Sequence, residues 1–587
     1  MRYSWKIGGP AGYGIKSAGA IFTKAFLKKG LNVFYYSEYP SLIRGGHNTV
    51  QVDISDEKVR SSSQKISFLI ALDDLTVKMD KGYLRKGGVL IYDENSIQDK
   101  KNLPKENVYG IPFSDIAKEA GGLLLRNTVA LGASFAFFGC RLKELEKAIE
   151  ITFEKKDEKI IKENVAAAKA GYNYAKKTFS FNPVEFFDVV RSSKGKRSMT
   201  GNEAAAMGAI VGGLKFYAAY PMTPATAILH YLAKHQRDYD LVVHQGEDEI
   251  GVIHEAIGAS FAGARSMVGT SGGGFALMGE GFSLSGMTET PLVIAEVMRP
   301  SPASGLPTWT DQGDLSFVLN SGHGDFPRAV FAPGDPEEAY ELIQEALNVS
   351  EHYQMPVVFL SDKFLGESKY TISSSRLRDI KIKIDRGEII SKVGKDYKRY
   401  LNERSGISSR VFPGTEGGEH VANSDEHDSH GFTVEGFTKD RTIQMNKRQR
   451  KMAALKKEMK LPKIFGPKNA DISFVSWGSN KGPILDALES ADYKIGKGKQ
   501  SANYIHFTHI YPLPLGVKKI LKQANRLILV ECNQSAQFGK LLAQEFGIKI
   551  KEKILKYDSR PFWPEEITQY FNVHKIDKTL KSLWKKN

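Results

Sequence analysis

The sequence has 587 residues, 41% hydrophobic and 25% charged, which is typical of a water-soluble protein with about three or four domains. It contains 82 Lys and Arg residues against 67 Asp and Glu residues, for a formal net charge of +15. Its only cysteines, Cys140 and Cys532, are far apart in the chain, which excludes a disulfide framework, a cysteine-ligated iron–sulfur cluster and a structural zinc site within it and suits a reducing compartment.

The positive charge is scattered along the chain, with one dense cluster from Lys447 to Lys463. No aromatic-interleaved basic patch accompanies it, so we expect no nucleic-acid partner. The first nine residues lack the apolar core of a secretory signal. The longest apolar run, 204–222, is rich in Gly and Ala and is interrupted by Lys215, which favours a buried helix and strand over a membrane span. We therefore expect a cytoplasmic protein without membrane contact.

Residues 1–180 are predicted to form the first α/β domain. A strand pattern at 3–7 is followed by the glycine-rich sequence GGPAGYG at 8–14 and by apolar residues at helical spacing from 15 to 26. A strand, a glycine loop and a helix in this order can hold a phosphate at the helix amino terminus.

The glycine loop does not match either common nucleotide motif. A P-loop fails because Ile15 separates Gly14 from Lys16, and a dinucleotide fingerprint fails because Ser17 stands where a third glycine is needed. Two alternatives stay open: an anion site of another kind, and a glycine turn that serves close packing only.

Residues 181–198 form a basic, serine-containing linker, and residues 199–375 are predicted to form the central domain. Near its start, the sequence YPMTP at 220–224 places a proline on each side of Thr223. Proline does not fit inside a helix or a central strand and biases the preceding residue toward extended geometry, so Thr223 is expected on a stiff loop.

Glu249 begins an alanine- and glycine-rich helical pattern at 250–264, where an acidic side chain suits the positive helix start. After a short strand, the sequence SGGG at 271–274 is predicted to be a turn. Glycine there lets the backbone bend and lets a ligand approach closely, and Gly272 and Gly273 are candidate ligand contacts.

Strands and helices alternate through the rest of the central domain, with strand patterns at 292–296 and 357–360 and a helical pattern at 336–348. This alternation predicts a parallel sheet covered on both faces. The last part of the chain, 466–587, shows the same alternation and is predicted to be a smaller doubly wound domain.

The connector at 376–465 is polar and lacks clear periodicity. His and acidic residues crowd at 419–430, which could form a metal site, but no fixed ligand spacing stands out. A long solvated loop is the favoured interpretation, followed by a basic helix from Lys447 to Lys460.

Four sequences occur in order: YPMTPAT at 220–226, EIGVIHEAIGASFAGAR at 249–265, TSGGG at 270–274 and EVMRPSP at 296–302. Together they resemble the pyrimidine-binding domain of the alpha subunit in the 2-oxoacid:ferredoxin oxidoreductases, which are thiamine diphosphate enzymes. The family usually has YPITP in the first motif, and methionine is close to isoleucine in volume.

The flanking domains extend this resemblance to nearly the whole chain. GGPAGYGIKSAG at 8–19 and SEYPSLIRGGHN at 37–48 are similar to the family's gamma subunit, and residues 466–587 resemble the transketolase carboxy-terminal domain. The chain therefore looks like a gamma and alpha fusion with an α/β fold of three doubly wound, mostly parallel-sheet domains.

The resemblance implies roles for particular residues. Glu249 would hydrogen-bond the thiamine pyrimidine ring, Thr223 would lie beside a substrate oxygen, and Arg299 would bind a carboxylate through its planar guanidinium group. Further cofactor contacts would be Tyr220, Pro221, Gly272 and Gly273. Taken singly, Glu249 could cap its helix, Thr223 could satisfy its own turn, and Arg299 could pair with Glu296 or Asp311.

On the gamma side, the resemblance associates the first domain with coenzyme A. Gly12, Gly14 and Arg44 are candidates for contact with a phosphate or with a partner chain, and a surface ion pair is an equal alternative for Arg44. The GDG motif that holds thiamine pyrophosphate is missing from this sequence. A separate beta subunit would therefore bind the pyrophosphate and its Mg²⁺ and would carry the [4Fe-4S] cluster.

The implied complex, an α2β2 assembly, would decarboxylate a 2-oxoacid to an acyl-CoA and reduce ferredoxin. 2-Oxoglutarate is favoured, with pyruvate or a branched-chain oxoacid as alternatives. A hypothesis from another class is a nucleotide-binding regulatory or scaffold protein that uses the loop at 8–17.

Overall fold

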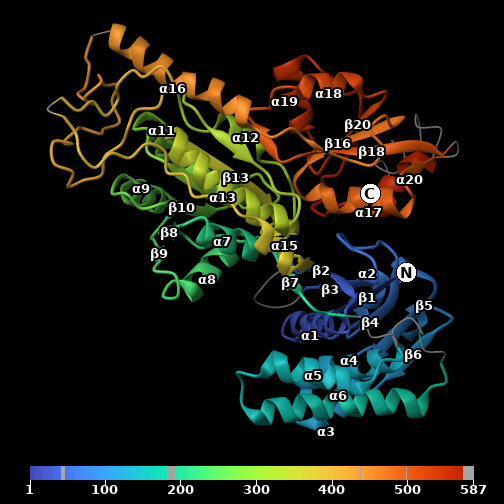
Figure 1. Ribbon diagram of the computed structural model, residues 1–587. Coiled ribbons are helices and arrows are strands. Elements are labelled where there is room, and N and C mark those ends of the chain that lie inside the picture. The colour runs from blue at the N-terminus through green and yellow to red at the C-terminus, as the bar shows by residue number, and fades with distance from the viewer. Residues whose placement is uncertain are drawn as a thin grey trace. The chain divides into compact units, whose positions relative to one another are not determined.

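The computed structural model describes residues 1–40, 46–181, 184, 192–394, 396–436, 438–496 and 499–572. The chain divides into two compact units, each described here by itself (Figure 1). Unit 1 comprises residues 1–199, 368–376 and 563–565, and unit 2 comprises the remainder.

Unit 1 is built on an eight-stranded sheet with the order β6-β5-β4-β1-β3-β2-β14-β7. Its strands are β1 (Arg2–Gly9), β2 (Asn32–Glu38), β3 (Asn48–Ser55), β4 (Ile66–Ala71), β5 (Leu84–Asp93), β6 (Val108–Ile111), β7 (Lys196–Met199) and β14 (Lys369–Ser373). The half from β1 to β6 is parallel, whereas β3, β2, β14 and β7 pair antiparallel. The first sheet is therefore mixed, with a parallel half and an antiparallel half.

Both faces of this sheet are covered, as the doubly wound prediction requires. On β4, Phe68 and Ile70 belong to the larger core, and Leu69 and Ala71 belong to the smaller core that includes Val77 of α2. Successive side chains of a strand point to opposite faces, so the two cores lie on opposite sides. The helices are α1 (Ile15–Lys28), α2 (Asp74–Asp80), α3 (Phe113–Ala120), α4 (Arg126–Phe137), α5 (Leu142–Phe153) and α6 (Glu158–Thr178).

Strand β14 corrects the domain boundary expected at residue 375. Its residues 369–373 were expected in the central domain, but they join the sheet of unit 1 between β2 and β7. The Thr371 hydroxyl accepts from the Val33 amide at 2.8 Å and donates to the Val33 carbonyl at 3.0 Å. Pairing with a strand more than 300 residues away leaves no signal in the local sequence.

Unit 2 contains a seven-stranded sheet with the order β19-β12-β13-β11-β10-β8-β9, parallel throughout except at the edge strand β19. The strands are β8 (Phe216–Ala219), β9 (Val242–Gln245), β10 (Ser266–Thr270), β11 (Leu292–Met298), β12 (Ala329–Phe331), β13 (Pro356–Asp362) and β19 (His509–Tyr511). The helices are α7 (Gly201–Val211), α8 (Thr226–His235), α9 (Glu249–Phe261), α10 (Gly272–Leu277), α11 (Gly279–Met287), α12 (Leu315–Asn320), α13 (Pro336–Tyr353) and α14 (Lys363–Glu367).

The third sheet, also in unit 2, has the order β15-β18-β16-β20-β21, with β17 beside β18. Its strands are β15 (Lys463–Phe465), β16 (Ile472–Trp477), β17 (Lys494–Ile495), β18 (Gln500–Phe507), β20 (Leu527–Glu531) and β21 (Glu552–Leu555). Helices α17 (Lys481–Ser490), α18 (Val517–Gln523), α19 (Gln537–Phe546) and α20 (Pro564–Asn572) belong to this region. The predicted α/β class with three sheets is confirmed.

The connector has little regular structure but is well packed. After α15 (Ser374–Asp379), the described residues up to 436 show only isolated bridges, such as Ile389 with Arg410. The predicted basic helix exists as α16 (Thr438–Glu458) and begins earlier than expected. Lys447 and Lys451 on this helix are fully buried, so α16 is not a solvated helix.

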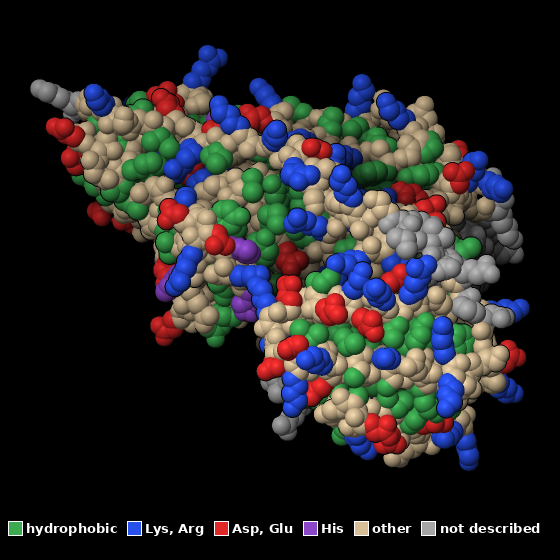
Figure 2. Space-filling view, turned by 60° about the horizontal axis from the view of Figure 1, so that its bottom comes forward, with side chains coloured by type: hydrophobic (Ala, Val, Ile, Leu, Met, Phe, Trp, Pro, Cys, Tyr) green, Lys and Arg blue, Asp and Glu red, His purple; other side chains and the backbone are tan. Residues whose placement is uncertain are grey.

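On the face shown in Figure 2, Lys and Arg side chains are scattered rather than gathered into a single patch. This distribution agrees with the scattered charge of the sequence. Among the described residues, no helix combines the length and the apolar character needed to cross a bilayer.

Candidate functional site

The amino terminus of α9 presents Glu249. The helix is capped by Asp248, whose side chain accepts from the amide of Gly251 at 2.7 Å, so Glu249 is not the capping residue. Glu249 is only 4% exposed, and its Oε1 atom has no hydrogen-bond partner in the described ranges of the chain. Leaving a buried carboxyl oxygen unpaired costs free energy, so this atom is available for a ligand.

Gly274 makes the space in which Glu249 lies. A Cβ atom on Gly274 would stand 2.6 Å from Cγ and 2.7 Å from Oε1 of Glu249, and 2.1 Å from Oγ1 of Thr270. These separations are shorter than any van der Waals contact, so only glycine fits without moving the carboxyl group. Sequence reasoning missed this role, although the run of three glycines was the available signal.

The predicted turn at 271–274 is wrong, because Gly272 and Gly273 are instead the first residues of the short helix α10. The two candidate glycines have different surroundings. A Cβ atom on Gly272 would lie 2.4 Å from Oδ2 of Asp314, whereas the atoms nearest to a Cβ atom on Gly273 are 3.9 Å away. Gly272 is therefore needed for packing on Asp314, and Gly273 borders open space.

The loop after β8 brings Thr223 and Arg299 together. The Thr223 carbonyl oxygen accepts a hydrogen bond from Nη1 of Arg299 at 2.8 Å. Tyr220 and Pro221, at the start of the loop, are exposed, whereas Thr223 is half-buried. The backbone of this loop therefore holds the guanidinium group of Arg299 in position.

Arg299 is 9% exposed, and its Nε atom has no partner. Burial lowers the pKa of Arg299, and the carboxyl groups of Asp314 and Glu249 act in the opposite direction. These two acids, rather than Glu296 or Asp311, are its electrostatic partners. Arg299 thus combines a fixed orientation with a hydrogen-bond donor that a ligand could use.

Glu296 and Asp314 form an acid pair behind Arg299 that sequence reasoning did not identify. Burial raises the pKa of Glu296 well above its ordinary range, and the Asp314 carboxyl group adds to this shift. Burial also raises the pKa of Asp314, although Glu296, Ser301 and Arg299 oppose it. Two buried carboxyl groups close to each other disfavour simultaneous ionisation, and the upward pKa shift is the stronger one at Glu296.

The segment that carries Asp314 is held by the carboxy-terminal domain. The Gln312 amide donates to the Cys532 carbonyl at 2.8 Å, and Gln537 Nε2 donates to the Gly313 carbonyl at 2.6 Å. Glu531, which is fully buried, accepts from the amides at the start of α19. Glu531 therefore has a packing role at the start of α19.

The glycine loop of unit 1 offers a weaker candidate site. Gly14 has a φ of 71°. Its carbonyl oxygen accepts a hydrogen bond from Nδ2 of Asn127 at 3.0 Å. A Cβ atom on Gly14 would collide with the Asn127 side chain. Gly12, at φ 90°, has no atom of the described residues within 4 Å of a Cβ position. The Lys16 ammonium lies 3.4 Å from the centroid of the Tyr39 ring. Arg44 lies outside the described residues.

The His and acidic residues of the connector do not converge. His430 contacts Asp396 at 2.9 Å, and the His427 ring lies 4.0 Å from the Tyr400 ring. Within the described part of the chain, no three His, Cys, Asp or Glu side chains are grouped to hold a metal ion.

Comparison with protein families gives two matches. Residues 207–447 match the model described as pyruvate flavodoxin/ferredoxin oxidoreductase, thiamine diphosphate-binding, and residues 4–174 match the model described as pyruvate ferredoxin/flavodoxin oxidoreductase.

Two relatives and one solved structure are similar over nearly the full length. The chain is 33% identical to a 2-oxoacid:ferredoxin oxidoreductase subunit alpha from Sulfolobus sp, covering 97% of this chain and 96% of the relative. It is 28% identical to the 2-oxoglutarate oxidoreductase subunit KorA of Mycobacterium tuberculosis, covering 97% and 91%. The structure of 2-oxoglutarate:ferredoxin oxidoreductase from Magnetococcus marinus, with 2-oxoglutarate, coenzyme A and succinyl-CoA bound, has a TM-score of 0.89 at 30% identity and covers 97% of this chain and 98% of that one.

Proposed function

The chain belongs to the 2-oxoacid:ferredoxin oxidoreductases, and from this membership we propose that it is the fused gamma and alpha subunit of a complex acting on 2-oxoglutarate. The complex would convert 2-oxoglutarate and coenzyme A to succinyl-CoA and CO2. The two electrons released by this oxidation would pass to ferredoxin, and one proton would be released.

The observation that carries this proposal is the buried, unpartnered Oε1 of Glu249 in the space left by Gly274. An acid with a free hydrogen-bonding position fits a heterocyclic ring nitrogen, so the site suits the pyrimidine ring of thiamine diphosphate. When bound, that cofactor would supply the electron sink for decarboxylation. The names of the relatives from Mycobacterium tuberculosis and Magnetococcus marinus support 2-oxoglutarate as the substrate.

In this proposal, each residue of the chain has a defined task. Glu249 would hydrogen-bond the ring nitrogen through its Oε1 atom. Arg299 presents its free Nε–H to a substrate carboxylate, and the Thr223 carbonyl together with Asp314 keeps the guanidinium plane in place. Tyr220, Pro221, Gly272 and Gly273 would form the wall against the cofactor.

The remaining components are proposed to come from other chains. With two cysteines and no GDG motif, this chain has neither the ligands of a [4Fe-4S] cluster nor the motif that holds Mg²⁺ and pyrophosphate. A beta subunit would supply them in a cytoplasmic α2β2 complex. Coenzyme A would bind near the gamma part, where Gly12, Gly14 and Arg44 are the candidates for phosphate contact.

The test is to co-express this chain with its beta partner and to measure dye reduction with a panel of 2-oxoacids and coenzyme A. We expect kcat/KM to be at least about 10-fold higher for 2-oxoglutarate than for pyruvate or branched-chain oxoacids, since a second carboxylate allows a further ion pair. A preference for pyruvate would contradict the substrate and leave the subunit assignment intact. Failure of the assembled complex to oxidise any 2-oxoacid would contradict both.

Replacing Gly274 by alanine is expected to lower kcat/KM by about 100-fold, because the new methyl group must displace the Glu249 carboxyl group by an ångström or so. The affinity for thiamine diphosphate should fall in parallel. Gly258→Ala is the matched control: it lies in α9 and is exposed, with no atom within 4 Å of its Cβ position. Equal activity of the two variants would show that Gly274 does not position Glu249.

A further inference from the structure

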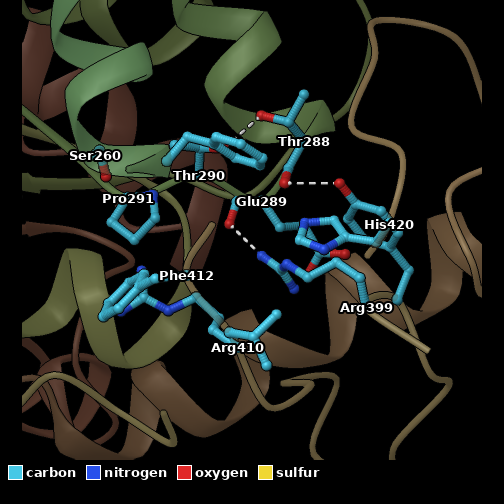
Figure 3. A pocket seen from close by; sticks show the side chains of 12 residues that line it. Ser260, Thr288, Glu289, Thr290, Pro291, Arg399, Arg410, Phe412 and His420 are labelled. Atoms are coloured by element: carbon cyan, nitrogen blue, oxygen red, sulfur yellow. Dashed lines mark hydrogen bonds between the residues drawn. The ribbon is translucent and has the colours of Figure 1, made fainter. Parts of the chain in front are cut away.

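A small cavity lies within unit 2, away from Glu249, between the central domain and the connector. Its volume is about 20 Å³. Thr290 and Pro291 line one side of it, and Arg399, Arg410 and Phe412 of the connector line the other (Figure 3). A space of this size can hold one water molecule or one monatomic ion.

Two buried arginines at this cavity have unused hydrogen-bond donors. Arg399 is 5% exposed and Arg410 is 4% exposed. Arg399 donates from Nη2 to the Glu289 carbonyl at 2.9 Å, and Arg410 donates from Nη2 to the Arg386 carbonyl at 2.9 Å. Nη1 of Arg399 and Nε of Arg410 have no hydrogen-bond partner within the part of the chain that the structure describes. Buried charged donors without acceptors are costly, so an acceptor is expected beside them.

The nearby carboxylates are already engaged by other cations. Glu289 pairs with Lys447 at 2.6 Å and with Lys451, and both lysines are fully buried. Glu351 pairs with Arg386 at 2.6 Å and lies 3.7 Å from Arg410. Two buried acids are therefore shared among a larger set of buried cations: Arg265, Arg399, Arg410, Lys447 and Lys451.

The excess of buried positive charge also lowers the pKa values of cations in this cluster. Burial lowers the pKa of Lys451 to about 7 and that of Arg410 to about 10, and the charge of Arg399 contributes to both shifts. Like charges repel strongly where water is excluded. A water molecule could accept the free hydrogen bonds but would not offset this charge.

We propose that this cavity binds one monovalent anion of the size of chloride, held by the guanidinium groups of Arg399 and Arg410. The apolar rings of Pro291 and Phe412 on its wall suit a weakly hydrated halide. Because both arginines belong to the connector and residues 288–291 belong to the central domain, the anion fastens the connector to that domain. It is a structural site, separate from the proposed chemistry at Glu249.

The first test is thermal unfolding of the full-length chain at constant ionic strength, with gluconate replaced stepwise by chloride or bromide. Both halides are expected to raise Tm by about 2–4 °C in a saturable manner. Bromide is the diagnostic salt, since strongly excluded salts such as sulfate stabilise folded proteins in general. A Tm that does not change with halide, or that changes equally with every salt, overturns the proposal.

Variants and crystals complete the test. Arg399→Gln should lose at least half of the halide-dependent shift, while Arg404→Gln, an exposed arginine of the same segment, should keep it. If Arg399→Gln does not fold, bromide-soaked crystals of the unaltered chain decide the question. An anomalous peak between Arg399 and Arg410 supports the site, and a water molecule there in the presence of bromide overturns it.

Discussion

Replacing Glu249 by alanine in the assembled complex is expected to lower 2-oxoacid decarboxylation by about 10²- to 10⁴-fold, the usual contribution of one positioned proton-transfer group. Alanine removes the buried Oε1 atom, which has no hydrogen-bond partner among the described residues. The helix should persist, because Asp248 provides its cap. Dye reduction with 2-oxoglutarate and coenzyme A measures the loss.

The matched control is Glu247→Gln, since Glu247 is exposed and lies two residues before Glu249. Glu249→Gln keeps the shape of the side chain but alters its proton, and should also be strongly impaired. Size-exclusion chromatography checks that each variant assembles with the beta subunit. Turnover of Glu249→Ala close to that of the Glu247 control would contradict the assigned role.

Replacing Glu289 by alanine is expected to lower the free energy of unfolding by about 3–5 kcal/mol. Glu289 is fully buried and is the carboxylate partner of Lys447 and Lys451, which are also fully buried. Its removal leaves two ammonium groups without a counter-charge in a site that excludes water. Denaturant unfolding of the full-length chain at fixed chloride concentration measures this loss.

Two comparisons make the Glu289 experiment specific. Glu280→Ala removes an exposed acid from the same region and should change stability by less than about 0.5 kcal/mol. Adding Lys447→Met and Lys451→Met to Glu289→Ala should recover most of the loss, because apolar groups of similar volume replace buried ions at little cost. A triple variant as unstable as the single one would contradict the ion-pair explanation.

The pH dependence of this cluster follows from the direction of each pKa shift. Burial opposes ionisation of Glu289, but Lys447 and Lys451 outweigh it and hold its pKa well below the ordinary range. The stability that Glu289 contributes is therefore present above its unfolded pKa of about 4.5 and decreases as the pH falls below it. The pKa of Lys451 is lowered to about 7, so its contribution improves as the pH rises from about 7 toward 10.5.

The sequence predicted the parts of this protein that depend on short-range patterns. The helix expected at 250–264 is α9, and the strands expected at 292–296 and 357–360 lie within β11 and β13. These predictions succeeded because apolar periodicity is set by burial against immediate neighbours. The motif order also determined the family, since long strings of particular residues leave few alternatives.

Local patterns were misleading where the outcome depended on distant segments. The glycine run at 271–274 has the composition of a turn, but its residues begin α10 because Gly274 must make room for Glu249 and Gly272 must lie against Asp314. Similarly, Asp248 and Glu249 both stand at the start of the helical pattern, where an acidic side chain is favourable. Only the folded chain assigns the cap to Asp248 and leaves Glu249 available.

The connector shows most clearly what the sequence could not predict. Its polar composition predicted a solvated loop and a basic helix, and composition cannot reveal that Lys447 and Lys451 are buried on Glu289. The sequence by itself determined the family, the α/β class and the candidate acid at position 249. The tertiary structure decided which charges are buried together and which glycine makes space for the acid, because both depend on contacts between residues far apart in the chain.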